Sequence, residues 1–206
     1  MRTGRIYLVL ILGFLSLLLA NTASATSVTM KFEYQDQHYY VSINGSSTYT
    51  PLMCDSYDNN VTRGETWTAT VTPFLQGIAG SMFGSSMIVD YKAAGLIYKS
   101  MLAGTLTALQ AHWAVWGLFS SNAQTNALFA TYGGAATDAA YLALAQTASN
   151  SAYNSLLLYT PLNGKPGTGP QEFIGFSPVP EPGTLTLFGA GLIGVAALIR
   201  RRRAKV

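Results

Sequence analysis

The chain has 206 residues, of which 49% are hydrophobic and only 10% are charged, with a net charge of +3. The positive charge belongs to the two ends, because residues 26–179 carry five Lys or Arg against eight Asp or Glu. This mildly acidic central part lacks the basic surface of a nucleic-acid-binding protein. Two histidines and one cysteine are too few for a zinc site. We therefore expect no nucleic-acid partner, no metal and no cofactor.

The N-terminus has the order of a secretory signal peptide. Arg2 and Arg5 precede an apolar run, Ile6–Leu19, and the small residues Ala23 and Ala25 follow in the Ala-x-Ala arrangement. The run is shorter than the roughly 20 residues that a membrane-spanning helix needs. We expect residues 1–25 to form a signal helix that is cleaved after Ala25, so that the rest of the chain is exported.

Residues 26–177 are predicted to form one exported α+β domain. Apolar and polar residues alternate up to about Thr72, which indicates antiparallel strands. Helical spacing then predicts four helices. The first starts near Asp90, and the other three cover Leu106–Phe119, Asn126–Thr131 and Asp138–Thr147. Strand character returns at Ser155–Tyr159 and Gln171–Phe176. The sequence thus predicts an antiparallel β-sheet or barrel with an inserted helical group.

Residues 178–206 form a third segment with its own pattern. Gly183–Ile199 is an uncharged stretch of 17 residues, at the lower limit for a single transmembrane helix. A basic cluster follows directly and is predicted to hold this end of the chain on the cytoplasmic side of the inner membrane. It consists of Arg200, Arg201, Arg202 and Arg203. Before the span, two prolines exclude a helix and leave an extended segment.

The extended segment is Val179, Pro180, Glu181 and Pro182. Together with the short span and the arginine cluster it resembles the PEP-CTERM sorting signal of exported proteins from Gram-negative bacteria. The resemblance implies recognition and cleavage near these residues by an exosortase-type membrane transpeptidase. It also implies a protein that is transiently anchored in the inner membrane and then reaches the cell surface or the extracellular matrix, where exopolysaccharide or a surface ligand is its expected partner.

Cys54 is the only cysteine, so it cannot form an internal disulfide. A buried, inert thiol is one interpretation, and an internal thioester with a glutamine carboxamide is the other. The stretch that begins at Leu52 and ends at Phe119 is similar to the thioester domains of bacterial surface adhesins. Those domains carry the acyl-donor glutamine in a Thr-Gln-x-Ala-Ile-Trp helix.

Aligning Ala114–Trp116 with the Ala-Ile-Trp of that helix places His112 at the glutamine position. Gln110 lies two residues earlier, about 200° around a helix. Because an imidazole has no carboxamide, we expect Cys54 to be buried near His112 or Gln110 without a thioester. A bond between Cys54 and Gln110 remains the alternative.

Known enzyme motifs are nearly absent from the sequence. Asp55, Asp58 and Glu65 are the closest acidic cluster, and a glycoside hydrolase needs a carboxylate pair in a cleft. The run of residues 55–60 also offers oxygen ligands for calcium, without EF-hand spacing. We favour a non-enzymatic surface or exopolysaccharide-matrix protein with a structural or adhesive role. A covalent adhesin and a polysaccharide-active hydrolase are the alternatives.

Overall fold

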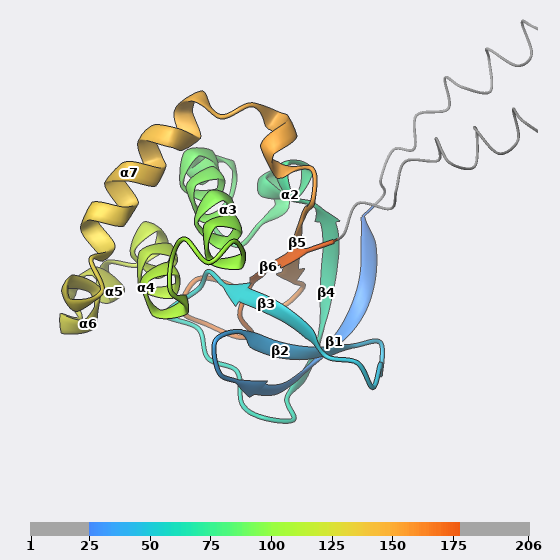
Figure 1. Ribbon diagram of the computed structural model, residues 1–206. Coiled ribbons are helices and arrows are strands. Elements are labelled where there is room, and N and C mark those ends of the chain that lie inside the picture. Colours follow the sequence, from blue (N-terminus) through green and yellow to red (C-terminus); the bar gives the residue numbers. More distant parts are fainter. Residues whose placement is uncertain (1–24, 178–206) are drawn as a thin grey trace, which may run out of the picture.

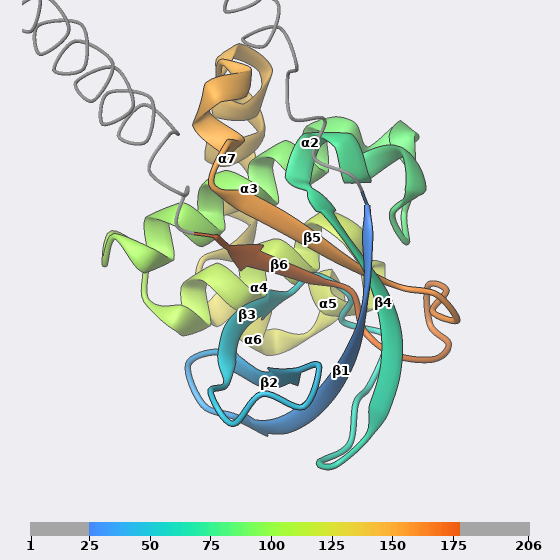
Figure 2. The same ribbon diagram turned by 90° about the vertical axis from the view of Figure 1, so that its right-hand side faces the viewer.

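The computed structural model describes residues 25–177, and its strands close into a six-stranded antiparallel barrel (Figure 1, Figure 2). Four strands precede the helices: β1 (Thr26–Gln35), β2 (Tyr39–Ile43), β3 (Thr50–Cys54) and β4 (Thr66–Pro73). Two strands follow them: β5 (Leu156–Pro161) and β6 (Phe173–Phe176). The order around the barrel is β1-β2-β3-β6-β5-β4, and the closure leaves no free sheet edge.

The helices form one group between β4 and β5. The three longest are α3 (Ile88–Leu102), α4 (Ala108–Phe119) and α7 (Gly134–Thr147). Shorter helices connect them: α2 (Phe74–Gly77), η2 (Ile78–Gly80), η3 (Ser85–Met87), α5 (Ser121–Thr125), α6 (Ala127–Thr131) and η4 (Asn150–Tyr153). The group covers the side of the barrel that contains β3, β5 and β6 (Figure 1).

These three strands are buried on both faces, because one face points into the barrel and the other meets the helices. Along β3, Leu52 and Cys54 belong to the barrel interior, whereas Met53 packs into the layer between barrel and helices. This explains why the sequence of these strands is continuously apolar, whereas β1 alternates. Gly95 lets α3 approach this layer, since an added Cβ would lie 2.9 Å from Leu156 Cδ1.

The expected α+β class, with a helical group inserted into an antiparallel barrel, is confirmed. The helix predicted to start at Asp138 begins earlier, at Gly134. The short helices of residues 74–87 were not predicted, because they are too short to show a helical period. Within residues 25–177 no helix combines the length and hydropathy that a bilayer span requires. The predicted signal helix and C-terminal span lie outside the described residues.

Candidate functional site

Cys54 ends β3 with its side chain inside the barrel, where it is fully buried. Its Sγ lies 3.7 Å from the carbonyl oxygen of Ser56. In the pairing of β3 with β6, Cys54 lies directly opposite Phe173. The strand register therefore decides which residues of β6 can reach the thiol.

Gln171 is the residue that this register brings to Cys54. It precedes Phe173 by two positions, so it belongs to the same face and is the diagonal neighbour of Cys54, at roughly 7–8 Å between Cα atoms. The backbone bond from Asp55 N to Glu172 O, at 3.3 Å, continues the ladder past the ends of both strands. A glutamine and a cysteine side chain together can span this diagonal distance.

The carboxamide of Gln171 is buried and only partly bonded. Its Nε2 donates to Asn59 O at 2.6 Å and to Ser56 O at 3.4 Å, the same carbonyl that the Cys54 thiol approaches. Its Oε1 has no hydrogen-bond donor among the described residues. The hydroxyl of Tyr39 lies within reach of both Cys54 and Gln171. The thiol and the carboxamide therefore share one pocket.

Two loops hold Gln171 in this position. Asn59 Nδ2 donates to the carbonyl oxygens of Lys165 and Gly169, at 2.9 and 3.0 Å, and Gly167 N donates to Asn59 Oδ1 at 2.9 Å. The loop of residues 162–170 is thereby fastened to the loop that follows Cys54. Gln171 directly follows the loop of residues 162–170, so the two loops fix its carboxamide beside the Ser56 carbonyl that the thiol also approaches.

Helix α4 closes the other side of the pocket. The indole of Trp116 lies near the Cys54 thiol, and its buried N–H has no oxygen or nitrogen acceptor in the part of the chain that the structure describes. The His112 ring packs between Tyr39 and Trp116, at centroid distances of 5.9 and 5.3 Å. His112 Nδ1 lies 2.8 Å from Ala108 O, which makes it the donor nitrogen of a neutral imidazole. Its Nε2 is then a buried lone pair without a hydrogen-bond donor.

Burial keeps the groups of this pocket uncharged. It raises the pKa of the Cys54 thiol to about 12, and the nearby carboxyl of Asp55 adds to the effect. Burial also lowers the pKa of His112 to about 4 and raises the pKa of the Tyr39 phenol. At neutral pH the pocket holds a thiol, a neutral imidazole and a phenol.

Gln110 does not supply a carboxamide to Cys54, which corrects the predicted alternative pairing. It lies in the first turn of α4, where its Oε1 accepts hydrogen bonds from Thr107 N and Thr107 Oγ1, both at 3.0 Å. Thr107 Oγ1 in turn accepts from Gln110 N at 3.3 Å, so the two residues form a capping box. The Gln110 side chain is therefore engaged in capping the start of α4.

A second buried polar group lies on the opposite face of the same strands. Asp55 and Glu172 are fully buried, and their carboxyl groups interact. Glu172 accepts hydrogen bonds from Tyr91 Oη, from Thr160 Oγ1 at 2.5 Å and from Met82 N at 2.9 Å. Neither Asp55 oxygen accepts a hydrogen bond from any of residues 25–177. Burial first, and the neighbouring Glu172 second, raise the pKa of Asp55 well above its usual value.

The acidic residues of the predicted cluster therefore do not converge. Asp58 is exposed and accepts from Asn122 Nδ2 at 2.8 Å, and Glu65 accepts from Thr62 N at 2.8 Å. Asp55 instead meets Glu172, which the sequence did not single out. Within residues 25–177 no group of three or more His, Cys, Asp and Glu side chains is arranged to hold a metal ion.

The predicted processing residues lie almost entirely outside the described residues. This applies to Ala23, to Val179, Pro180, Glu181 and Pro182, and to Arg200, Arg201, Arg202 and Arg203. Ala25 is the first described residue and is exposed.

The sequence alone does not indicate that Gln171 belongs to the same site as Cys54. The residue opens a predicted strand, but 117 positions separate it from Cys54, and a strand pattern does not reveal which strand lies beside which. The arrangement brings a buried thiol and a buried primary carboxamide together, and these are the two groups from which an internal thioester forms.

Residues 178–203 match the family described as the PEP-CTERM protein-sorting motif. No curated protein and no solved structure matches the chain. The matched segment contains the Pro-Glu-Pro residues, the apolar stretch and the arginine cluster. The chain therefore carries a PEP-CTERM sorting motif at residues 178–203, which implies export and processing by an exosortase-type membrane enzyme.

Proposed function

We propose that the exported domain is an adhesive surface protein whose reactive element is an internal thioester between Cys54 and Gln171. The observation that supports this proposal is the shared contact of both side chains with the carbonyl oxygen of Ser56. A sorted surface protein meets amines and hydroxyls on other molecules, and a thioester is an acyl donor to both. The resemblance of residues 52–119 to thioester domains concerns the position of Cys54 alone, because it places the acyl donor in the helix that contains His112.

The reaction that forms the bond is an acyl transfer within the pocket. Cys54 Sγ attacks the side-chain carbonyl carbon of Gln171, the S–C bond forms, and the C–N bond breaks. The thiol proton leaves with the nitrogen as ammonia, so that atoms and charge balance. His112 Nε2 is the candidate base that carries this proton, because it is the free lone pair of the neutral imidazole.

The surroundings of the pocket suit the product as well as the reaction. Tyr39 Oη and Trp116 Nε1 lie beside the thiol, as does Ser56 Oγ at 3.9 Å, and Tyr39 and Trp116 are candidates for stabilising the oxyanion of the tetrahedral intermediate. The fully buried position of Cys54 excludes water, which slows the hydrolysis of a thioester. Reaction with a partner then requires the partner's nucleophile to reach the pocket.

The intact mass of the released protein tests the proposal. We expect the native chain to be lighter than its sequence predicts by one ammonia, and methylamine to convert it to a product one methylene heavier than the unmodified chain. Cys54→Ser and Gln171→Glu should both show the full unmodified mass of their own sequences. The measurement is mass spectrometry of the native protein with and without methylamine.

Gln110→Glu is the matched control for this experiment, because glutamate also completes a Thr-x-x-Glu capping box. This variant should keep the ammonia loss. An unshifted native mass, with a thiol that reacts with iodoacetamide only after denaturation, would contradict the thioester. The domain would then be a non-covalent structural component of the matrix.

A second candidate function is non-covalent binding of exopolysaccharide by tyrosines on the outside of the barrel. A β-bulge between Phe32 and Tyr34 shifts the register of β1, so that Tyr34 pairs with Tyr40 and shares its outward face. The two rings stack at 4.4 Å, and Tyr49 meets Tyr34 edge-on at 6.0 Å. Tyr34 is 40% exposed and Tyr49 is 42% exposed.

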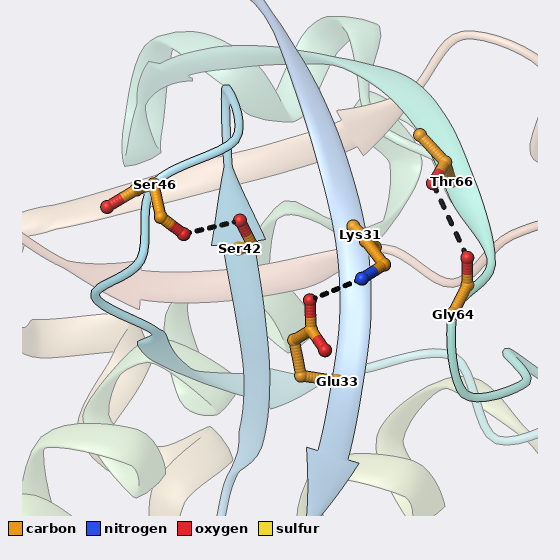
Figure 3. A network of polar contacts seen from close by, with 6 residues as sticks. All are labelled: Lys31, Glu33, Ser42, Ser46, Gly64 and Thr66. Carbon is orange, nitrogen blue, oxygen red and sulfur yellow. Dashed lines mark hydrogen bonds and ion pairs between the residues drawn. The ribbon is translucent and has the colours of Figure 1, made fainter.

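The surface beside these tyrosines is polar but carries little net charge. Lys31 and Glu33 form an ion pair of 2.9 Å on β1, and Ser42 of β2 donates to Ser46 O at 2.7 Å (Figure 3). Ser42 is buried, so the polar groups available beside the exposed rings are those of Lys31 and Glu33, which add hydrogen-bonding groups to an apolar stacking surface. This combination suits a neutral sugar polymer.

Removing the rings tests this candidate. We expect Tyr34→Ala and Tyr49→Ala each to weaken binding to the host's own exopolysaccharide about tenfold, if each ring contributes roughly 1.4 kcal/mol. Phe176→Ala is the control, since Phe176 is an aromatic residue that is 43% exposed on another strand. Affinity electrophoresis in gels containing the polysaccharide measures the change. Equal retardation of all three variants and the parent protein would argue against a tyrosine site.

A further inference from the structure

The helical group contains a cavity of about 380 Å³ that neither the thiol pocket nor the tyrosine surface involves. Two carboxylates line it, Asp90 from α3 and Asp138 from α7. The remaining wall is mostly apolar and consists of Leu118, Phe129, Ala135, Ala139 and Leu142, with Gln124 at one side. An apolar cavity with a few fixed polar groups is typical of a small-ligand site.

Asp138 is the unusual member of this cavity. Asp138 is only 8% exposed, and its Oδ1 is buried without any hydrogen-bond donor among the described residues. Its Oδ2 lies so close to Gly117 that a Cβ added there would approach to 2.7 Å. The glycine thus provides the room that the carboxylate occupies. A buried carboxyl group without donors is costly unless something outside the described contacts compensates it.

No cation of the domain compensates this charge. Among the described residues Asp138 and Asp90 have no ion-pair partner, and the lysines of α3 point elsewhere: Lys92 Nζ lies over the Tyr153 ring, and Lys99 Nζ donates to Ala152 O. Helix α7 carries no basic residue, and neither do α4, α5 and α6 apart from His112, which faces the barrel.

We propose that this cavity binds the ammonium group of a primary alkylamine between Asp90 and Asp138. The two carboxylates provide the negative charge, and the apolar wall accommodates the hydrocarbon chain. A divalent metal fits less well, because calcium takes six to eight oxygen ligands and magnesium an octahedral set. Gln124 already donates its Nε2 to Gly117 O at 2.7 Å, which leaves one further side-chain oxygen at most.

Binding should depend on pH through the two carboxyl groups alone. Burial first, and the charge of Asp90 second, raise the pKa of Asp138 to about 7. Burial also raises the pKa of Asp90. A proton on Asp138 competes with the ammonium group, so affinity should rise from pH 5 to pH 8, whereas an alkylamine stays protonated over this range.

Titration of the ¹⁵N-labelled released protein with butylammonium tests the proposal, with butanol as the neutral probe of similar shape. At pH 8 we expect butylammonium to shift the amide signals of Gly117 and Ala139 with millimolar affinity, and butanol to bind at least about tenfold more weakly. Asp138→Asn should weaken butylammonium binding about tenfold, and Asp90→Asn should weaken it less. Asp36→Asn, an exposed carboxylate far along the chain, should change nothing.

Three results would overturn the assignment. Equal binding of butylammonium and butanol would mean an apolar cavity without charge recognition. Signal shifts with calcium chloride that exceed those with butylammonium would mean a metal site. Unchanged affinity in both aspartate variants, each with a native-like spectrum, would place the amine elsewhere. Because Asp90 is only half-buried, its variant keeps the test valid even if Asp138→Asn does not fold.

Discussion

Glu172→Ala is expected to lower the free energy of unfolding by about 3–5 kcal/mol, the largest effect of any single side chain discussed. The substitution removes the acceptor of three hydrogen bonds, from Tyr91, Thr160 and Met82, in a place that water does not reach. Each donor that loses its partner inside the protein costs about 1–3 kcal/mol. Urea-induced unfolding, followed by tryptophan fluorescence, measures the loss.

Glu65→Ala is the control for this substitution. Glu65 also accepts two hydrogen bonds, from Thr62 N and Thr62 Oγ1, but they are exposed to solvent. We expect its loss to cost less than about 1 kcal/mol. If Glu172→Ala were as stable as Glu65→Ala, the carboxyl group at position 172 would not organise the layer between barrel and helices.

The pairing of Glu172 with Asp55 adds a pH dependence to this stability. The pKa values of both groups are raised in the folded protein, mainly by burial, so the folded state binds protons more strongly than the unfolded state. Their contribution is complete below the unfolded pKa values, near 4, and is lost as the pH rises through the folded values. The carboxyl groups of Asp90 and Asp138 act in the same direction.

The buried imidazole of His112, with its pKa lowered to about 4, opposes this trend below the unfolded histidine pKa near 6.5. Thermal unfolding between pH 6.5 and pH 8 should therefore show a melting temperature that falls with increasing pH. Asp55→Asn keeps a hydrogen-bond donor to Glu172 but cannot ionise, so it should flatten this slope. A parent protein whose stability rises from pH 6.5 to pH 8 would contradict the raised pKa values of the two carboxyl groups.

Local pattern predicted the elements of this fold well. The alternation of Met30, Phe32 and Tyr34 indicates a strand with one face inside the barrel, apart from the bulge that turns Tyr34 outward. In the same way, apolar residues that repeat with a helical period predict the helix that ends at Phe119. These signals lie within a few residues of one another, so a single segment contains them.

The candidate site, in contrast, could not be predicted from any single segment of the sequence. Gln171 and Glu172 directly precede β6. Cys54 is the last residue of β3 and Asp55 follows it, more than a hundred residues earlier in the chain. Only the pairing of β3 with β6 decides that these residues meet. The resemblance to thioester domains drew attention to Gln110, whereas the structure assigns that glutamine to a helix cap.

Glu181→Ala is expected to prevent release of the protein from the inner membrane. In the sequence Glu181 is the only charged residue between Glu172 and Arg200, and a proline flanks it on each side. It is therefore the charged contact available for recognition within the matched sorting motif. Membrane fractionation and analysis of the culture medium measure release, with nearly complete loss as the expected result.

Replacing Arg200–Arg203 by alanine separates recognition from orientation. Basic residues after a short apolar stretch hold that end in the cytoplasm, so their loss should allow part of the chain to pass through the membrane uncleaved. Glu181→Ala should instead accumulate as a membrane-bound form that lacks only residues 1–25. Glu172 cannot serve as a control because it is buried in the fold, but Glu65→Ala changes an exposed glutamate and should be released normally. Normal release of Glu181→Ala, as a chain ending near residue 181, would show that the enzyme recognises the prolines or the span rather than this carboxylate.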